Sequence, residues 1–259
     1  MKLFDLHLHS NFSFDSVEDP EKIVKSAIAK NVEVMGFTDH YDIFLGDKEP
    51  CMYNLNDYFK EIDRLRDKYS SKIKILRGIE IGLNLNFKGF IDRLIDLYPF
   101  DYVIGSIHGI YEDDIFENRD KIEKNPHFWL NKYYDYILKC LNSFDNFNIL
   151  GHLDYIDRYI DFKYDPYDYL DRVEEIFKLL IKKNIALEIN TGGLRKGLNF
   201  PHPKKVFLDR YFDLGGRFLT LGSDAHRASD VACDFDFALK YISEYPMELI
   251  YFERGKMIK

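Results

Sequence analysis

KLFDLHLH, residues 2 to 9, is a short apolar run that ends in a polar island, and this pattern decides the fold. A run of this length, rich in leucine and phenylalanine, is typical of a buried strand. Successive side chains of a strand point to opposite faces, so His7 and His9 are predicted to point to the same side. A His-x-His pair alone is weak evidence for a metal site, so its meaning depends on the rest of the chain.

The same pattern recurs along the whole chain. Seven runs are short, rich in branched or aromatic residues and closed by polar residues, and we predict them to be strands: residues 2–9, 33–40, 72–83, 100–109, 147–155, 185–191 and 217–224. Helical patterns lie between them, and strands that alternate with helices form a parallel sheet with both faces buried. Seven such repeats favour an α/β fold with a closed or nearly closed (β/α)7 barrel over an open sheet.

Three of the intervening segments carry helix signals. Asp19, followed by Pro20 and an apolar stripe, is a candidate N-cap residue, and Asn31 is the predicted end of that helix. Residues from about 166 to 183 place their apolar side chains on one face, which indicates packing against the strands. Residues 111–146 exceed the length of a simple crossover, so they are predicted to form two helices or a helix with a lid, with their aromatic side chains in the core.

Length and composition limit the kind of protein. With 259 residues, 46% of them hydrophobic and 31% charged, the chain is predicted to be a single soluble domain, residues 1–259. No apolar run approaches the ~18 residues of a membrane span, and residues 1–10 show no signal-peptide pattern, so we expect a cytoplasmic protein. The three widely spaced cysteines fit reduced thiols. A net charge of −8 without a basic stripe argues against a nucleic-acid partner.

Nine side chains suited to metal binding lie in the polar islands, and six of the eight histidines are among them. They are His7, His9, Asp15, His40, Glu80, His108, His152, Asp224 and His226. The carboxyl ends of barrel strands meet at one face, where barrel enzymes place catalysis, so these side chains are predicted to converge. Imidazole and carboxylate ligands without cysteine suit catalytic Zn, Mn, Fe or Co. Nine ligands are too many for one ion with an open position, which implies two or three divalent metal ions.

The order of these islands resembles the polymerase and histidinol phosphatase (PHP) family. The series is His7-Leu8-His9, Thr38-Asp39-His40, Gly78-Ile79-Glu80, Ser106-Ile107-His108-Gly109, Gly151-His152 and Gly222-Ser223-Asp224-Ala225-His226. The resemblance covers residues 2 to about 228 and implies a distorted barrel of seven strands with a trinuclear metal centre.

The resemblance also implies which residues hold each ion. One ion would be held by His7, His9, Glu80 and Asp224, a second by Glu80, His108 and His152, and a third by Asp15, His40 and His226, with Glu80 as a bridge. Asp15 is open to another interpretation, because it could instead cap the helix that follows.

Further motifs resemble the histidinol-phosphatase branch of that family. They are Glu188-Ile189-Asn190-Thr191-Gly192-Gly193-Leu194-Arg195, Pro201-His202-Pro203, and Gly151-His152-Leu153-Asp154 followed by Arg158. A guanidinium group can pair two phosphate oxygens at once, so Arg158 and Arg195 are the candidate phosphate-binding residues. His202, between two prolines, is predicted either to line the substrate pocket or to be structural.

The resemblance implies a metal-dependent phosphomonoesterase that hydrolyses L-histidinol phosphate in histidine biosynthesis, with a small-molecule phosphomonoester as its partner. Glu80, Asp224 and His226 are the candidate catalytic residues, and Asp224 or a water would protonate the leaving oxygen. Residues 248–252 resemble a final edge strand, which could pair within the chain or across a homodimer.

Other interpretations use the same residues. A PHP exonuclease would need a basic channel for its strand, which an acidic chain does not favour. A phosphotyrosine phosphatase and a non-catalytic metal-binding scaffold stay open, and activity measurements would separate them. An amidohydrolase barrel also begins with His-x-His, but it would be expected to present a metal-bridging lysine where this chain has Ser106-Ile107-His108.

Overall fold

Residues 3–43 and 51–259 are described by a computed structural model of the chain. The strands are β1 (Phe4–Leu8), β2 (Val34–Phe37), β3 (His40–Tyr41), β4 (Lys74–Arg77), β5 (Glu80–Gly82), β6 (Ile104–Ser106), β7 (Gly109–Ile110), β8 (Asp113–Asp114), β9 (Ile149–Leu150), β10 (Ala186–Asn190), β11 (Phe218–Gly222), β12 (Glu248–Leu249), β13 (Tyr251–Glu253) and β14 (Lys256–Ile258). The α-helices are α1 (Pro20–Ala29), α2 (Leu55–Tyr69), α3 (Lys88–Leu97), α4 (Arg119–Lys124), α5 (Pro126–Ser143), α6 (Leu170–Lys183), α7 (Gly192–Arg195), α8 (Lys205–Asp213) and α9 (Phe235–Ile242). Short 3-10 helices are η1 (Leu85–Phe87), η2 (Tyr155–Tyr159), η3 (Pro166–Tyr169) and η4 (Ala228–Asp230).

The strands form a distorted barrel made of two parallel sheets. One sheet has the order β1-β2-β4, and the other has the order β12-β11-β10-β9-β6-β5-β3. Two predicted runs are each divided between the sheets, because β2 and β3 belong to the run 33–40 and β4 and β5 belong to the run 72–83. The α/β fold with parallel strands in all seven predicted runs is confirmed. Lys2, where the first predicted run begins, lies outside the described residues.

Backbone hydrogen bonds join β1 of one sheet to the segment that follows β11 of the other. The amide of Asp224 donates to the carbonyl of His7 at 2.9 Å, and the amide of His9 donates to the carbonyl of Ala225 at 2.9 Å. Both bonds lie just beyond the carboxyl ends of β1 and β11, so they bring two of the predicted ligand islands side by side.

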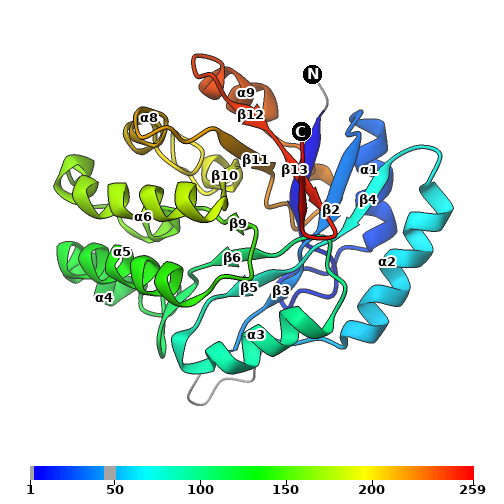
Figure 1. Ribbon diagram of the computed structural model, residues 1–259, viewed down its shortest axis with the longest axis horizontal. Coiled ribbons are helices and arrows are strands. Elements are labelled where there is room, and N and C mark those ends of the chain that lie inside the picture. Colours follow the sequence, from blue (N-terminus) through cyan, green and yellow to red (C-terminus); the bar gives the residue numbers. More distant parts are fainter. Residues whose placement is uncertain (1–2, 44–50) are drawn as a thin grey trace.

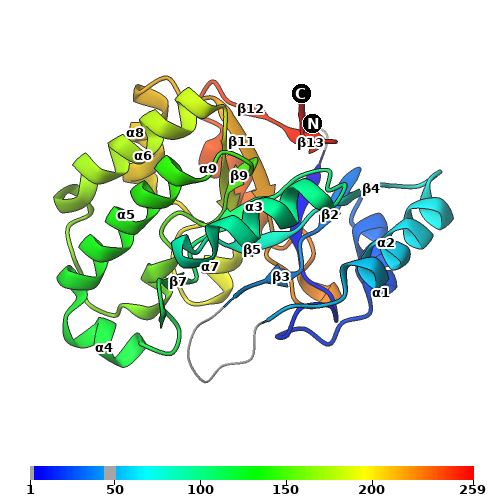
Figure 2. The same cartoon turned by 60° about the horizontal axis from the view of Figure 1, so that its bottom comes forward.

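Helices surround the strands on the outside of the molecule (Figures 1 and 2). Helix α1 begins where the sequence predicts: the carboxylate of Asp19 accepts a hydrogen bond from the amide of Glu21 at 2.7 Å, and Pro20 occupies the first turn. Asn31, the predicted end, follows the helix with a positive φ of 58°. The predicted helix at 166–183 is found as η3 followed by α6, whose Val173 and Phe177 are fully buried. Among the described residues, no helix is both long and apolar enough to cross a membrane.

The long segment 111–146 forms the short strand β8 and then the two helices α4 and α5. This matches the first of the two predicted arrangements, which was a pair of helices. Four of its five predicted core aromatics are buried: Trp129, Tyr133, Tyr134 and Tyr136. Phe128 is the exception, since 54% of it is exposed. This segment therefore packs chiefly as an extension of the core.

The C-terminal strands pair within the chain. β12 adds to β11 in parallel register, and β13 and β14 form an antiparallel hairpin. The ring of Tyr251 on β13 packs edge-on against Phe4 of β1, with ring centroids 5.2 Å apart. The predicted edge segment at 248–252 thus pairs within the chain, because β12 extends the seven-stranded sheet and β13 belongs to the hairpin.

Candidate metal centre

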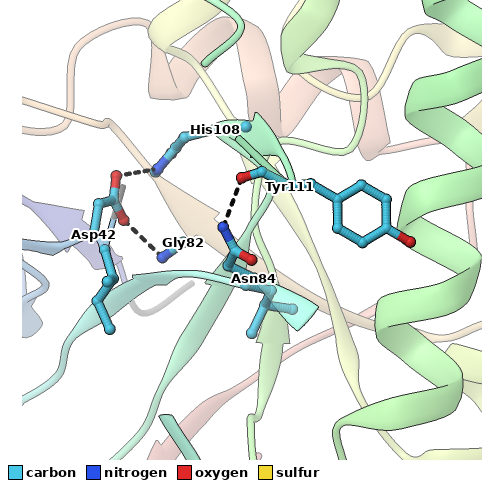
Figure 3. A pocket seen from close by; sticks show the side chains of 8 residues that line it. Asp42, Gly82, Asn84, His108 and Tyr111 are labelled. Carbon is cyan, nitrogen blue, oxygen red and sulfur yellow. Dashed lines mark hydrogen bonds and ion pairs between the residues drawn. The ribbon is translucent and has the colours of Figure 1, made fainter. Parts of the chain in front are cut away.

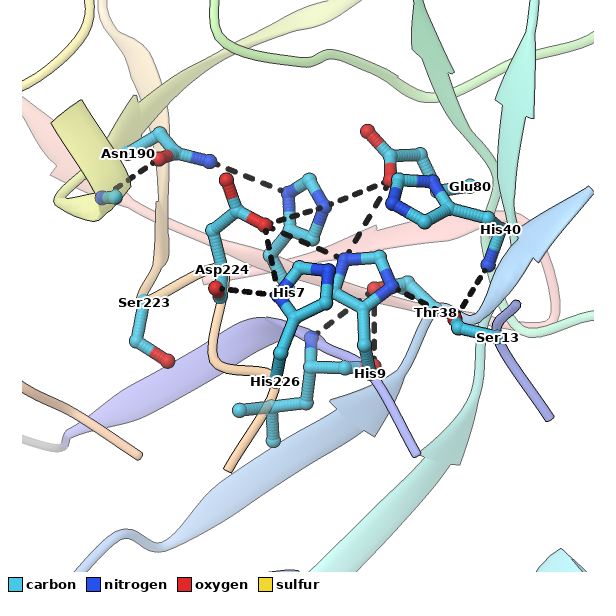
Figure 4. Close-up of polar contacts among 12 residues, drawn as sticks. His7, His9, Ser13, Thr38, His40, Glu80, Asn190, Ser223, Asp224 and His226 are labelled. Carbon is cyan, nitrogen blue, oxygen red and sulfur yellow. Dashed lines mark hydrogen bonds and ion pairs between the residues drawn. The ribbon is translucent and has the colours of Figure 1, made fainter. Parts of the chain in front are cut away.

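The nine predicted metal ligands meet at one end of the barrel. Figure 4 shows six of them: His7, His9, His40, Glu80, Asp224 and His226. They lie at or just after the carboxyl ends of the strand runs, except Asp15, which comes from the loop between β1 and α1. Six of them are buried; His40 is 11% exposed, and His226 and Asp15 lie nearer the surface, at 29% and 36%. The predicted convergence is therefore observed for every ligand candidate.

Glu80 lies at the centre of this cluster. Its Oε1 is 2.9 Å from Nε2 of His152 and 3.2 Å from Nε2 of His108. Its Oε2 is 2.8 Å from Nδ1 of His40 and 3.1 Å from Nε2 of His7. Because each carboxylate oxygen faces a different pair of imidazoles, Glu80 has the arrangement that a bridging ligand needs.

Four buried polar atoms at the centre of the cluster lie close to one another as possible ion pairs, but they make no hydrogen bond among the described residues. These atoms are Nε2 of His7, Nε2 of His9, Nδ1 of His40 and Oε2 of Glu80. A buried polar group without a hydrogen bond is costly, and all four atoms are ones that bind metal well. The cluster contains four groups of three residues whose ligand atoms lie within 4.8 Å of one another: His9, His40 and His226; His7, His9 and Asp224; His7, Glu80 and His152; and His40, Glu80 and His108. This donor set fits divalent metal ions.

The charges within the cluster shift its protonation equilibria. Burial opposes ionisation of Glu80, but the surrounding histidines, with His7 and His40 the strongest, hold its pKa well below the ordinary value. Burial also opposes protonation of His108, yet Asp42 and Glu80 raise the pKa of that imidazole to about 9. Burial lowers the pKa of His152 to about 4, although Glu80 opposes the shift. Neighbouring imidazoles of one cluster thus differ in whether they carry a proton near neutral pH.

Supporting side chains hold the outer nitrogen of several of these imidazoles. Glu188 on β10 lies 2.6 Å from Nδ1 of His7, and Asp42 lies 2.8 Å from Nδ1 of His108. Carboxylates in this position fix the ring orientation and leave the other nitrogen available to a metal. The sequence analysis assigned neither residue a role. A weak signal existed, because Asp42 follows His40 at the spacing of one strand face and Glu188 lies in a branch motif.

Asp42 and His108 line a small pocket (Figure 3) as well as the main cavity. The other carboxylate oxygen of Asp42 accepts a hydrogen bond from the amide of Gly82 at 2.7 Å. Nearby, the side-chain amide of Asn84 donates to the carbonyl of Tyr111 at 2.8 Å. With a volume of about 10 Å³, this pocket has room for little more than a water, so its residues support His108.

Asp15 contacts the cluster and leaves the helix cap to another residue. Its Oδ2 is 3.0 Å from Nε2 of His226 and 3.5 Å from Nε2 of His40. Burial opposes its ionisation, but these two imidazoles outweigh that effect and lower its pKa. Since Asp19 caps α1, the alternative in which Asp15 caps the helix is wrong.

The cluster forms one wall of a cavity of about 1020 Å³. Arg158 and Arg195, which we call the arginine wall, also line this cavity, together with Tyr155 and Tyr159. Phe14, 64% exposed, lies at the mouth. The cavity is large enough for a small organic phosphate, and its two walls differ in their chemistry.

Arg158 is held by side chains on several elements. Its Nη2 donates to Oδ2 of Asp224 at 2.8 Å and to Oδ1 of Asn190 at 3.3 Å. Its guanidinium carbon lies 4.9 Å from the centroid of the Tyr155 ring. Burial opposes ionisation of Asp224, but Arg158 and nearby histidines hold the pKa of that carboxyl well below its ordinary range.

Arg195, at the end of α7, is held by the main chain. Its Nη2 donates to the carbonyl of Ser223 and, at 3.0 Å, to the carbonyl of Asp224. Its Nη1 is buried and has no hydrogen-bond partner among the described residues. Arg195 thus lines the cavity, and its Nη1 is a donor that no group of the described residues satisfies.

His202 lies behind the arginine wall. It is fully buried and is not among the residues that line the cavity. Its Nε2 faces Nε of Arg158 at 3.1 Å, so it reaches the cavity only through that residue. This position supports the structural role predicted for His202 and not the role of lining the substrate pocket.

The comparisons with known proteins define the class. A model of the PHP domain matches residues 5–192, more than half of the chain, so the chain belongs to the PHP domain family. A histidinol-phosphatase of Lactococcus lactis is 38% identical to it, over 88% of this chain and 86% of that protein. A probable histidinol-phosphatase of Clostridium acetobutylicum is 32% identical and covers 98% of both chains.

A solved structure is similar over the whole molecule. The crystal structure of histidinol phosphate phosphatase from Lactococcus lactis superposes with a TM-score of 0.86 at 33% identity, covering 100% of this chain and 99% of that one. That crystal structure is a complex with zinc, L-histidinol and phosphate. Within the PHP family, the chain is thus grouped with the histidinol-phosphatases.

Proposed function

We propose that this chain is a metal-dependent phosphomonoesterase that hydrolyses L-histidinol phosphate to L-histidinol and phosphate, a step of histidine biosynthesis. One observation carries the proposal: a cluster of nine candidate metal ligands lies beside two anchored arginines at one cavity. Similarity to histidinol-phosphatases over nearly the whole chain supports the choice of substrate.

Two or three divalent ions, from among Zn, Mn, Fe and Co, fit the donor set, and zinc is the ion in the related crystal structure. We assign one ion to His7, His9, Glu80 and Asp224, a second to Glu80, His108 and His152, and a third to Asp15, His40 and His226. When bound, such ions supply an activated water and neutralise the charge of the phosphoryl group.

The residues of the chain have complementary roles in the reaction. Arg158 and Arg195 hold phosphoryl oxygens and neutralise the charge that builds up in the transition state. Asp224 begins the reaction ionised, because Arg158 holds its pKa low. It therefore has no proton to give to the leaving oxygen, and its low pKa makes it a weak base, so its role is to hold an ion and to anchor Arg158. A water is the better candidate for that donation, and Glu80 and His226 act by holding the ions.

The proposed partner is a small-molecule phosphomonoester and not a nucleic acid. A single-strand exonuclease would need a positively charged track, and the chain carries a net charge of −8. The mouth of the cavity carries acidic residues, including Asp114 and Asp230, beside its basic ones. Such a mixed rim suits a substrate with a primary ammonium group better than a phosphate backbone.

Steady-state release of phosphate from L-histidinol phosphate by the metal-loaded protein tests the proposal. An aryl phosphate, a phosphotyrosine peptide and single-stranded DNA serve as comparison substrates. A strong preference for L-histidinol phosphate in kcat/KM is the expected result. Preference for the peptide or the DNA would move the chain to a rival phosphoesterase class, and metal binding without any hydrolysis would indicate a scaffold.

A further inference from the structure

A chain of buried side chains runs from Asp154 to the arginine wall. Oδ1 of Asp154 lies 2.6 Å from Nδ1 of His202, and Nε2 of His202 lies 3.1 Å from Nε of Arg158. The guanidinium group then reaches Asp224 through Nη2, at 2.8 Å. Asp154 and His202 are both fully buried, so neither touches a molecule in the cavity.

The donors and acceptors in this chain fix the tautomer of His202. Arg158 can only donate through Nε, so Nε2 of His202 is the acceptor in that contact and Nδ1 carries the imidazole proton. The acceptor of that proton is Oδ1 of Asp154, 2.6 Å away. Its second oxygen accepts the amide hydrogen of Lys204 at 2.9 Å. A carboxylate at Nδ1 keeps the imidazole proton on that nitrogen, so Nε2 presents a lone pair to the Nε–H of Arg158.

Two contacts therefore set the direction of the guanidinium plane. His202 accepts from Nε, while Asp224 and Asn190 accept from Nη2. An arginine held only at Nη2 could still rotate about that contact, whereas acceptors at both nitrogens leave one orientation. Arg158, held in this way, lines the cavity.

The backbone of α7 packs closely against Arg158 and His202, so two neighbouring positions have room only for glycine. A Cβ atom at Gly192 would come within 2.9 Å of Nη2 of Arg158, and one at Gly193 would come within 2.9 Å of Nε2 of His202. Both approaches are closer than real Cβ contacts, so the paired glycines let α7 lie directly against the network. This gives a physical reason for the Gly192-Gly193 pair that the sequence analysis noted only as part of a motif.

We infer that the Asp154–His202 pair positions Arg158 for phosphate binding, with His202 acting as a tautomer-locked acceptor and without touching the substrate. This inference rests on the proposed function for the identity of the reaction. It does not rest on which phosphomonoester is the substrate, because the arginine is directed at the phosphoryl group.

Two substitutions of His202 separate its two contacts. The amide of His202→Gln can place an oxygen near the position of Nε2 and keep the acceptor for Arg158. The shorter His202→Asn can keep the donor to Asp154 but loses the acceptor for Arg158. Binding of inorganic phosphate to the metal-loaded protein is measured by calorimetry, and hydrolysis of an aryl phosphate is measured beside it. Metal content and Tm are recorded for each variant.

We expect His202→Asn to weaken phosphate binding by roughly 10-fold to 100-fold, because a hydrogen bond to a charged group is lost. His202→Gln should stay within roughly fivefold of the original protein. In an Arg158→Lys background the same His202→Asn change should have almost no further effect, because lysine has no Nε–H to orient. Equal losses in the two variants, or an unchanged loss in the lysine background, would overturn the inference.

Asp154→Asn provides a second route if the His202 variants do not fold. Its amide can donate to Nδ1, which moves the imidazole proton to Nε2 and sets two donors against each other at Arg158. Phosphate binding by the folded, metal-loaded variant should then weaken, and unchanged binding would contradict the inference. If the original protein binds phosphate in this His202-dependent way but does not hydrolyse L-histidinol phosphate, the proposed substrate fails while the positioning role stands.

Discussion

The histidine wall and the arginine wall of the cavity are built in opposite ways. On the histidine wall, Nε2 of His7 and Nε2 of His9 are buried without hydrogen-bond partners among the described residues. On the arginine wall, Arg158 is already paired with Asp224, Asn190 and His202. The first wall therefore has unmet bonding capacity that an ion can satisfy, whereas the second is arranged before any ligand arrives.

This difference predicts distinct responses to damage. Removal of an ion should disable the histidine wall and leave its side chains able to bind again, because their outer nitrogens are still held, as His7 is by Glu188. Removing the guanidinium group of Arg158 is not reversible in this sense, because it leaves the carboxylate of Asp224 with an unpaired charge. The following predictions test that contrast, beginning with the largest effect.

Metal removal should have the largest effect. Exhaustive chelation is expected to lower phosphomonoesterase turnover by more than ~1000-fold, because the activated water and the charge neutralisation are both lost. Adding back Zn or Mn should restore activity and raise Tm as the ion concentration rises. Turnover and metal content are measured on the same samples. Full activity in metal-free protein would show that the histidine wall does not do the chemistry.

Arg158→Ala should be the most damaging substitution on the arginine wall. It removes a phosphate ligand and leaves the buried Asp224 without its cation, so we expect kcat/KM to fall by roughly 100-fold to 1000-fold. Unfolding should also become easier by about 3 kcal/mol. Kinetics and denaturant unfolding measure the two effects. Arg172→Ala, at an arginine that pairs with Asp135 on the surface, is the matched control and should change neither quantity much.

Asp42→Asn should lower the affinity of the histidine wall for metal ions. We expect metal affinity to fall by about 10-fold to 100-fold, because His108 loses the carboxylate that orients it. In the metal-free protein the pKa of His108 is raised to about 9, so the imidazole is protonated at pH 7.5 and must release that proton to bind an ion. Metal affinity should therefore rise with pH up to about 9.

Calorimetry in buffers with different ionisation enthalpies counts the protons that metal binding releases. In Asp42→Asn the pKa of His108 should fall, so fewer protons should be released at pH 7.5. Unaltered affinity together with unaltered proton release would mean that Asp42 does not act through His108.

Arg195→Ala should have a smaller effect, concentrated in KM. The main chain that holds Arg195 keeps its place when the side chain is removed, so no buried carboxylate is left unpaired. We expect KM to rise by about 10-fold with little change in kcat. Steady-state kinetics with L-histidinol phosphate measure both constants. A fall in kcat as large as that of Arg158→Ala would mean that anchoring by the main chain and anchoring by side chains do not differ in their effect on catalysis.

Asp19→Ala lies outside both walls and should have the smallest effect. Loss of the N-cap of α1 is expected to cost about 1 kcal/mol of the free energy of unfolding. Turnover per folded molecule should stay the same, because Asp19 caps the helix and Asp15 contacts the cluster. Denaturant unfolding and kcat test the two parts, and a loss of kcat would connect α1 to the metal centre.

The main lines of the fold and the place of the candidate ligands could be predicted from local sequence patterns. Apolar runs marked the strands, and polar islands at their ends marked the side chains that now lie together around Glu80. Periodicity does not show where a run breaks. The runs 33–40 and 72–83 are therefore divided between two sheets in a way that the pattern did not foresee.

Contacts between distant parts of the chain were beyond the sequence analysis. Periodicity gives the face on which a side chain lies, but not the residue that faces it from another strand. Asp154 and His202 are 48 positions apart, and Asp42 and His108 are 66 apart. Each pair became visible only through the fold, which explains why the ligands were foreseen and the residues that orient them were not.

Asp224 belongs to both walls at once. Its Oδ1 lies 3.4 Å from Nε2 of His9, and its Oδ2 accepts the hydrogen bond of Arg158. An ion bound at one carboxylate oxygen draws electron density from the other oxygen as well. The ion and the phosphate-binding arginine therefore share one carboxylate. Thermodynamic reciprocity then applies: by whatever factor an ion changes the affinity for phosphate, phosphate must change the affinity for that ion.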